Sequence, residues 1–168
     1  LPLHDVTAAT VETGTTSCWH ETEPTDLVFS VGQNGATNEV YKQQIAYCWA
    51  EIEGFSKFGE FIGNGTTTRN GPLVYCGFKP AFVLIRNTST AGSWVMFDNV
   101  RCSGNPNKAH LLANAANVES ISNQKVDFLA NGFKITNDGT NYGDSNGSGN
   151  SLIFAAFAES PFKTANAK

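Results

Sequence analysis

Short apolar segments, separated by clusters of Gly, Asn, Ser and Thr, constrain the fold of this sequence more than any other feature. The segments are rich in Val, Ile, Phe, Tyr and Trp, and most are too short for a typical helix. They predict strands near residues 26–31, 43–50, 55–62, 73–76, 80–86, 93–99, 126–129, 132–136 and 151–158. This spacing predicts an all-β, mainly antiparallel fold, a two-sheet sandwich or jelly roll with long Gly/Asn loops. We expect one domain over residues 1–168, with 1–18 as an extended N-terminal arm.

Local signals predict two hairpins and one short helix. Apolar residues 81–85 and 93–98 flank a polar loop, which favours a hairpin. Asn131-Gly132 predicts a tight hairpin with a type I′ turn, since both residues tolerate positive φ. Residues 108–116 are rich in Ala and Leu and predict at most one short helix.

An internal similarity links two apolar segments. Residues 45–51 (IAYCWAE) resemble residues 153–159 (IFAAFAE), and each follows a Phe-containing segment and a Gly/Asn loop. Two related hairpins would explain the similarity. Chance resemblance between apolar strands explains it equally well, so both interpretations stay open.

The surface is expected to be polar but weakly charged. Charged residues make up 15% of the chain, against about 25% in ordinary soluble domains, and 11 Lys and Arg face 15 Asp and Glu. Nucleic acids and anionic lipids require clustered cations, so we expect neither nucleic-acid nor membrane binding. No apolar run is long enough to cross a bilayer, and the first residues do not resemble a secretory signal.

The four cysteines, Cys18, Cys48, Cys76 and Cys102, are widely spaced and form no C-x-x-C pair. This spacing disfavours zinc, and we expect neither a metal nor a cofactor. Four cysteines allow three disulfide pairings. Cys48 and Cys76 lie inside apolar segments, which favours free buried thiols.

Catalytic motifs are weak. Gly143-Asp144-Ser145-Asn146-Gly147 has the G-x-S-x-G form, but no His follows Ser145, which disfavours a serine hydrolase. Glu51 with Glu53, or the scattered acids Asp98, Asp127 and Glu159, could supply the carboxylate pair of a glycosidase. Each of these acids could equally be a solvated charge at a sheet edge. We assign no catalytic residues.

A glycan site is the more specific alternative. Sugar-binding modules stack sugar rings on exposed aromatic residues beside polar side chains. Trp19 lies in a polar stretch and Tyr142 lies in a Gly/Asn loop with Asp144 and Asn146. These four residues are the candidate glycan-binding residues.

Short motifs in a fixed order resemble a β-rich domain of unknown function. They include Tyr47-Cys48-Trp49-Ala50-Glu51 and Val74-Tyr75-Cys76-Gly77-Phe78, and continue through residues 94–98, 127–134 and 156–163. The domain that they resemble occurs in tail-fibre and other structural proteins of marine and environmental tailed bacteriophages, and the resemblance covers about residues 19–168.

The resemblance implies a non-enzymatic virion protein, part of a tail fibre, a spike or a surface decoration, assembled in the host cytoplasm. Its expected partners are other virion proteins and further copies of itself. Two alternatives remain: a lectin-like module that binds host surface glycans, and a tailspike that degrades glycans.

Overall fold

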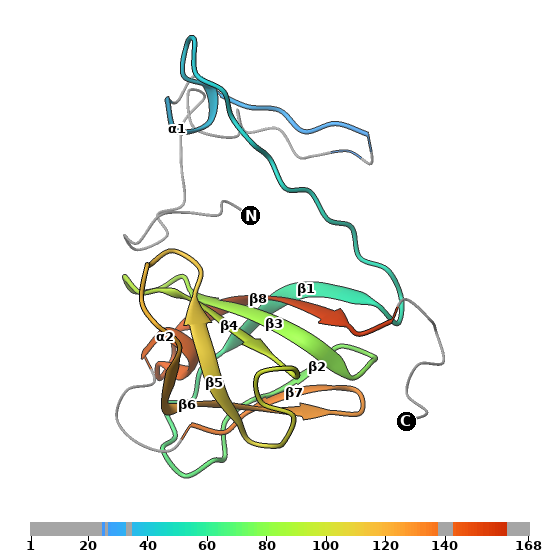
Figure 1. Cartoon of the computed structure of the whole chain (residues 1–168), viewed down its shortest axis with the longest axis vertical. Coiled ribbons are helices and arrows are strands. Elements are labelled where there is room, and N and C mark those ends of the chain that lie inside the picture. Colours follow the sequence, from blue (N-terminus) through green and yellow to red (C-terminus); the bar gives the residue numbers. More distant parts are fainter. Residues whose placement is uncertain (1–24, 26, 33–34, 138–142, 161–168) are drawn as a thin grey trace. The chain divides into compact units, whose positions relative to one another are not determined.

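The computed structural model describes residue 25 and residues 27–32, 35–137 and 143–160 (Figure 1). The described residues up to 49 form one unit and those from 50 onward form the other. The first unit contains the one-turn helix α1 (Gly35–Asn38). The second contains all eight strands and a second one-turn helix, α2 (Gly143–Asn146). The prediction of one domain with an arm at 1–18 stays a prediction, because 1–18 lie outside the described residues.

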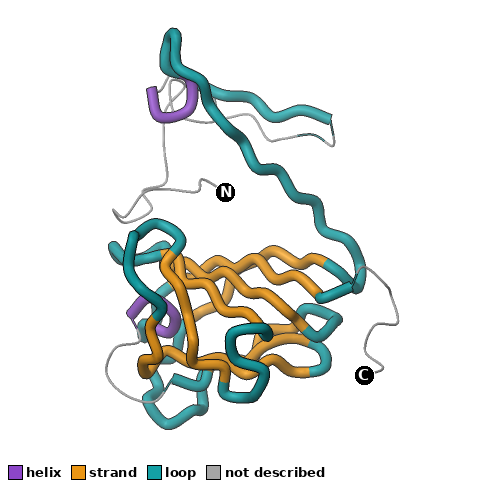
Figure 2. Tube along the Cα trace, viewed as in Figure 1, coloured by secondary structure: helices purple, strands orange, loops and turns teal. Residues whose placement is uncertain are grey.

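The second unit is one antiparallel sheet that curls into a nearly closed barrel (Figure 2). Its strands are β1 (Ser56–Ile62), β2 (Leu73–Tyr75), β3 (Pro80–Asn87), β4 (Trp94–Asp98), β5 (Asn107–Leu112), β6 (Ser120–Leu129), β7 (Gly132–Ile135) and β8 (Ser151–Ala158). They are ordered β1-β8-β3-β4-β5-β6-β7-β2. The all-β antiparallel prediction is therefore confirmed. The sequence predicted two packed sheets. In the structure the two layers are opposite walls of a single curled sheet.

The interior of the barrel is apolar because alternate residues of each strand point inward. Val83, Ile85, Val95, Val126 and Ile135 are completely buried, and larger rings fill the space between them. Three of those rings form a cluster where β1, β7 and β8 meet. Its centroid distances are 5.4 Å for Phe133–Phe154, 6.1 Å for Phe61–Phe133 and 6.4 Å for Phe61–Phe154.

The helix predicted at 108–116 is wrong, because this segment contributes β5. The strand pairs with β4 on one side and β6 on the other. Ala109 and His110 are 5% and 4% exposed, and the His110 ring lies 5.7 Å from the ring of Phe97. Pairing on both edges and burial of these side chains outweigh the high intrinsic helix propensity of Ala and Leu, which amounts to only a fraction of a kcal/mol per residue.

Both predicted hairpins exist, but one turn differs from the prediction. β3 pairs with β4, and β6 pairs with β7. In the second hairpin Leu129 pairs with Gly132, so the two loop residues are Ala130 and Asn131. Neither Asn131 nor Gly132 has positive φ, so the type I′ prediction is wrong. Gly132 is instead the first residue of β7. The neighbouring strand β2 lies so close here that a Cβ on residue 132 would be 2.0 Å from the Val74 carbonyl oxygen.

The strands predicted at 26–31 and 43–50 are absent from the described residues in those ranges. A strand requires a neighbouring edge that accepts its hydrogen bonds, and the described residues in these two ranges are not part of the eight-stranded sheet. Their apolar side chains are exposed instead: Ile45 is 80%, Tyr47 is 72% and Trp49 is 57% exposed. The Tyr47 and Trp49 rings stack at 6.2 Å with 15° between their planes.

A carboxylate fixes the turn after β4. Asp98 Oδ1 accepts hydrogen bonds from the main-chain N–H groups of Val100 (3.0 Å) and Arg101 (2.8 Å), and Oδ2 pairs with the Arg101 guanidinium. Partial burial alone would raise the pKa of Asp98. The hydrogen bonds and charge of Arg101, with the Val100 N–H, outweigh burial and lower that pKa below its usual value.

We expect Asp98→Asn to lower the free energy of unfolding at pH 7 by about 1–2 kcal/mol, through the lost charge-assisted bonds. Because the folded-state pKa is depressed, this stabilisation is present above the unfolded pKa near 3.9 and is lost as the pH falls through the folded pKa. Urea unfolding at pH 7 and in the acid range measures the difference, which should shrink in acid. The exposed Glu159→Gln is the matched control and should change little. A deficit of Asp98→Asn that is the same at every pH would contradict this explanation.

Candidate functional site

The two end strands of the sheet, β1 and β2, leave an open seam in the barrel wall. On β2, Ile135 N donates to Pro72 O at 3.0 Å and Cys76 N donates to Asn131 O at 2.8 Å. Even-numbered positions therefore bond to β7. Because antiparallel main-chain groups alternate in direction, the N–H and C=O of Leu73 and Tyr75 face the seam.

The same alternation orients β1. Ala158 N donates to Phe55 O at 2.7 Å and Gly63 N donates to Asn150 O at 2.9 Å, so odd-numbered positions bond to β8. The main-chain groups of Phe58, Glu60 and Ile62 consequently face the seam. We define the seam by these three residues of β1 together with Leu73 and Tyr75 of β2.

The beginning of the β1 edge that faces the seam already has hydrogen-bond partners in residues 50–52. Ser56 and Ile52 exchange main-chain hydrogen bonds of 2.9 and 3.3 Å. Phe58 N donates to Glu51 Oε1 at 3.2 Å, and Ser56 Oγ donates to Ala50 O at 2.8 Å. The open part of this edge therefore runs from the Phe58 carbonyl to Ile62.

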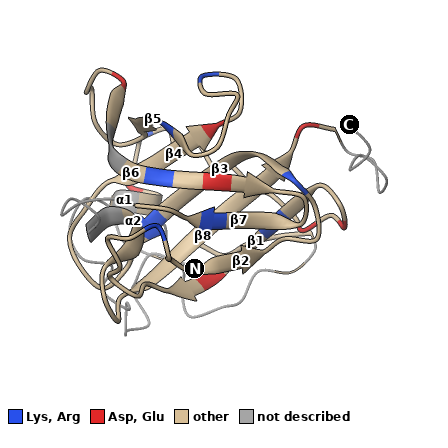
Figure 3. Ribbon diagram, turned by 90° about the horizontal axis from the view of Figure 1, so that it is seen from below, with Lys and Arg blue, Asp and Glu red and all other residues tan. Residues whose placement is uncertain are grey.

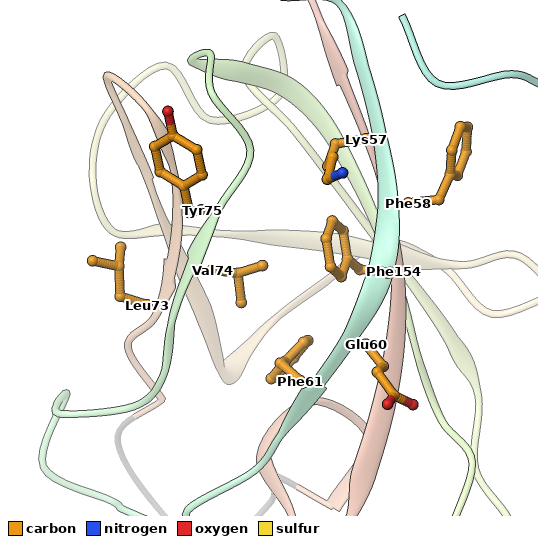
Figure 4. Close-up of a pocket in the computed structure, with 9 residues that line it drawn as sticks. Lys57, Phe58, Glu60, Phe61, Leu73, Val74, Tyr75 and Phe154 are labelled. Carbon is orange, nitrogen blue, oxygen red and sulfur yellow. The ribbon is translucent and has the colours of Figure 1, made fainter. Parts of the chain in front are cut away.

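A hollow of about 280 Å³ lies in the seam. It is lined by Lys57, Phe58, Gly59, Glu60 and Phe61 of β1, Leu73, Val74 and Tyr75 of β2, and Phe154 of β8. Figure 4 shows the side chains of Lys57, Phe61, Val74 and Phe154 between the two strands, and those of Phe58 and Glu60 on the other side of β1. A Cβ at position 59 would lie 3.0 Å from the Phe154 ring. The Phe154 ring therefore makes the hollow shallow beside Gly59.

Exposed apolar side chains flank the hollow. Leu73 is 62%, Tyr75 is 69% and Ile62 is 58% exposed. Unpaired strand edges with apolar side chains are sites where another strand can add. The arrangement favours recognition of an extended chain over chemistry on a small substrate.

Charged residues of both signs are spread over the strands and loops of the barrel (Figure 3). Lys57 Nζ lies 2.8 Å from Glu51 Oε2, and this hydrogen bond, followed by that from the Phe58 N–H, lowers the pKa of Glu51. Burial raises the pKa of Cys76 to about 12. Together with that of Asp98, these shifts follow from pairing or packing in the fold.

The cysteine and carboxylate predictions can be compared with the described residues. Cys48, Cys76 and Cys102 are free, as expected, whereas Cys48 is exposed and not buried. Glu51 is held by Lys57, so its carboxylate already has a structural partner. Within the described ranges no three His, Cys, Asp or Glu side chains gather as a metal site would require.

The G-x-S-x-G serine lies inside the fold. Ser145 belongs to α2 and is 1% exposed, and its Oγ accepts a hydrogen bond from Asn137 Nδ2 at 3.0 Å. Asn137 is itself completely buried, and its Oδ1 accepts from Lys125 N at 2.8 Å. Ser145 therefore contributes to a buried polar network that ties α2 to the β6–β7 hairpin.

Two of the four candidate glycan-binding residues, Trp19 and Tyr142, lie outside the described residues. Asp144 is placed only through the main chain of α2. Asn146 is completely buried; its Oδ1 accepts from Asn64 N at 3.0 Å and its Nδ2 donates to Asn64 Oδ1 at 3.1 Å. The amide thus joins the end of α2 to the loop that follows β1. Glycan binding at these residues stays a prediction.

A second, polar hollow of about 260 Å³ lies elsewhere on the barrel. Its lining consists of Arg69, Asn105, Pro106, Asp127, Lys134 and Thr136. Several of these polar groups already serve the fold. The Asn105 amide exchanges hydrogen bonds of 2.9 and 3.0 Å with the main chain of Phe128, and Thr136 Oγ1 donates to Asp127 at 3.5 Å.

Sequence reasoning missed the seam, because neither end strand carries a signal that it lacks a neighbour. Which strands end a sheet depends on the order of the strands in space, and that order is set by pairings between segments that are distant in sequence.

Comparison with known proteins gives a family without an assigned activity. None of the described helices is long and apolar enough to cross a membrane. No curated protein and no solved structure matches the chain. The model of one family, described as a domain of unknown function, DUF7483, matches residues 3–161. The chain therefore belongs to the DUF7483 family.

Proposed function

We propose that the chain is a non-enzymatic structural module of a bacteriophage virion, part of a tail fibre, a spike or a surface decoration, that assembles through the open edges of its barrel. The observation that carries the proposal is the seam, where the main-chain groups of two end strands and the exposed Leu73 and Tyr75 lie together. Such an edge is a means of assembly, and monomeric proteins usually cover or charge it.

Two further features support the proposal. The sequence resembles a domain of phage structural proteins over most of its length. The barrel is also held by an aromatic and aliphatic core with few charges, which suits a part that must persist outside a cell. The partners on this proposal are other virion proteins and further copies of the chain.

Analysis of purified particles tests the proposal. Phage encoding the chain are banded in a density gradient, and the chain is measured by quantitative mass spectrometry and located by immunogold labelling. We expect a fixed copy number per particle and label on the tail or the outer surface. Recovery of the chain only in the soluble lysate would contradict a virion role.

Enzymatic and lectin-like alternatives give different results. A tailspike hydrolase would release reducing sugar from host polysaccharide and lose this activity on Glu51→Gln. A lectin-like module would bind members of a glycan array, and the polar hollow around Asp127 and Lys134 is the described surface on which such binding is best sought.

A further inference from the structure

We propose that the polar hollow on the outer face of β6 and β7 is a binding site for a hexuronic acid, that is, a sugar ring that carries a carboxylate. The inference goes beyond the proposed structural role and does not depend on it. Three observations carry it: the strands and loops that form the hollow, the separation of its charges, and the backbone conformation of Arg69.

A cross-strand pair on the outer face of the barrel supplies two of the residues that line the hollow. Asp127 of β6 lies opposite Lys134 of β7, and Figure 3 shows a red segment of β6 beside a blue segment of β7. Their neighbours Val126 and Ile135 are completely buried in the core, so alternation turns the charged pair outward. Side chains paired in this way have Cβ atoms about 5 Å apart. The two opposite charges are therefore close enough to contact one ligand.

Loops on both sides of this pair supply other residues of the hollow. Asn105 exchanges hydrogen bonds of 2.9 and 3.0 Å with the main chain of Phe128, which places the loop between β4 and β5 beside β6. Arg69 N donates to Asn137 O at 3.2 Å, which places the loop between β1 and β2 beside the end of β7. The hollow is therefore built into the fold, as most small-molecule sites are.

The order of the strands separates the charges. β2 lies beside β7, and β5 lies beside β6. The two cations, Arg69 and Lys134, consequently lie on the β7 side of the hollow, and Asp127 lies on the β6 side. Adjacent strands are about 4.8 Å apart. A ligand that contacts both sides needs an anionic group at one end and hydrogen-bond donors at the other, roughly the width of a sugar ring away.

The charged groups have capacity for such a ligand. In the described part of the chain the Lys134 ammonium takes part in no hydrogen bond or ion pair. The Asp127 carboxylate accepts one long hydrogen bond, of 3.5 Å, from Thr136 Oγ1, and a carboxylate can accept about four. Arg69 has a further interaction in the fold. Its guanidinium carries several N–H donors, so a contact elsewhere leaves donors for a ligand.

A hexuronic acid matches these groups. Its carboxylate suits the two cations, and hydroxyl groups on the far side of its ring can donate to Asp127. The side chain of Pro106 gives the hollow an apolar surface for the C–H groups of the ring. The volume of about 260 Å³ is near the lower end for small-molecule sites, which suits a single ring.

Other small anions match less well. Sulfate carries no hydroxyl group that could donate to Asp127, and the carboxylate of Asp127 repels it. In an α-amino acid the ammonium and the carboxylate are attached to the same carbon, so they cannot reach opposite sides of the hollow. A neutral sugar leaves the cations without an anionic partner.

The backbone of Arg69 gives separate support. Its φ is 61°, in the left-handed region where glycine or asparagine is the usual residue. A bulky residue in this region costs stability, and such residues cluster at binding sites. Arg69 is exposed and lines the hollow. A function of the guanidinium in ligand binding explains why arginine occupies this position.

Titration calorimetry of the 168-residue chain is the primary test, with the methyl glycosides of D-glucuronic and D-galacturonic acid as probes because a glycoside keeps the ring closed. We expect at least one of these uronides to bind at a single site per chain. The matching neutral glycoside, with a hydroxymethyl group in place of the carboxylate, should bind at least about 10-fold more weakly. Sulfate and glycine should not compete. Binding of neither uronide, equal affinity for the neutral glycoside, or competition by sulfate or glycine would overturn the inference.

Lys134→Gln tests the cationic side of the hollow. It should weaken uronide binding at least about 10-fold while circular dichroism shows a folded barrel. Lys108→Gln is the matched control, since Lys108 is an exposed strand lysine that does not line the hollow. If Lys134→Gln fails to fold, Arg69→Asn gives the same test, because asparagine tolerates the left-handed backbone. Unchanged binding in the folded variant would overturn the inference.

Asp127→Ala tests the orientation of the sugar. The variant removes the acceptor for the hydroxyl groups, so uronide binding should weaken even though a repulsive charge is removed as well. Unchanged or stronger binding would mean that the ligand is recognised only as an anion, and would overturn the assignment to a sugar acid. Amide chemical shifts locate the site independently: the uronide should shift the signals of residues 105, 127 and 134, and shifts confined to other strands would contradict the inference.

These outcomes are independent of the virion experiment. Uronide binding by a chain that is absent from particles would remove the proposed function and leave the inference standing. A chain that is present in particles at a fixed copy number but binds no uronide would do the reverse.

Discussion

Phe133→Ala is expected to lower the free energy of unfolding of the barrel by about 3–5 kcal/mol. The side chain is completely buried, and its ring contacts Phe154 at 5.4 Å and Phe61 at 6.1 Å between centroids. Truncation removes the burial of the ring and leaves a cavity where β1, β7 and β8 meet. At about 2–4 °C per kcal/mol for a chain of this length, the melting temperature should fall by roughly 10 °C.

Thermal and urea unfolding followed by circular dichroism measure the effect. Phe58→Ala is the matched control, since Phe58 lies half-buried on the outer side of β1 and its ring contacts Phe157 at 5.7 Å. We expect a loss below about 2 kcal/mol there. Equal losses in the two variants would show that the inner cluster does not dominate the stability.

Gly132→Ala is expected to destabilise the protein by about 2–3 kcal/mol, through overpacking and not through a cavity. The added Cβ would lie 2.0 Å from the Val74 carbonyl oxygen, 3.0 Å from its carbon and 3.1 Å from the Cys76 nitrogen. These are main-chain atoms, so no side chain can rotate to relieve the contact. β2 would have to separate from β7.

Unfolding in urea gives the overall loss, and hydrogen exchange at Val74 reports whether β2 is released. Gly104→Ala is the control, because a Cβ at that position meets no atom within 4 Å and Ala narrows the unfolded ensemble. An unchanged exchange rate at Val74 in Gly132→Ala would contradict the proposed displacement of β2.

Most strands could be predicted because their apolar segments are bounded by clear turn signals. β8 was predicted at 151–158 and occupies those residues, and the β3–β4 and β6–β7 hairpins join segments that are neighbours in sequence. Local composition is sufficient where a strand is apolar and its partner follows at once along the chain.

The predictions for β5 and for residues 43–50 were wrong for opposite reasons. β5 is rich in Ala and Leu, so only its pairing with β4 and β6 makes it a strand. Residues 43–50 have strand composition but are not part of the eight-stranded sheet. Strand formation depends on partners that are distant in sequence, and a single sequence does not contain that information.

The candidate site was less predictable than the fold. Trp19 and Tyr142 lie outside the described residues, and the buried Asn146 amide joins the end of α2 to the loop at residue 64. The seam arises where β1 and β2 end the same curled sheet, although only residues 63–72 separate them in sequence. The position of the seam thus depends on the spatial order of the strands in the sheet, and no sequence motif predicts it.

Because the barrel has few ion pairs, its stability should depend little on the salt concentration. Its ion pairs, such as Lys57 with Glu51 and Arg101 with Asp98, lie at turns and near the surface, while the interior is held by apolar packing. Counterions screen exposed ion pairs but hardly affect the burial of apolar surface. The barrel should therefore remain folded with nearly the same stability in fresh water and in seawater.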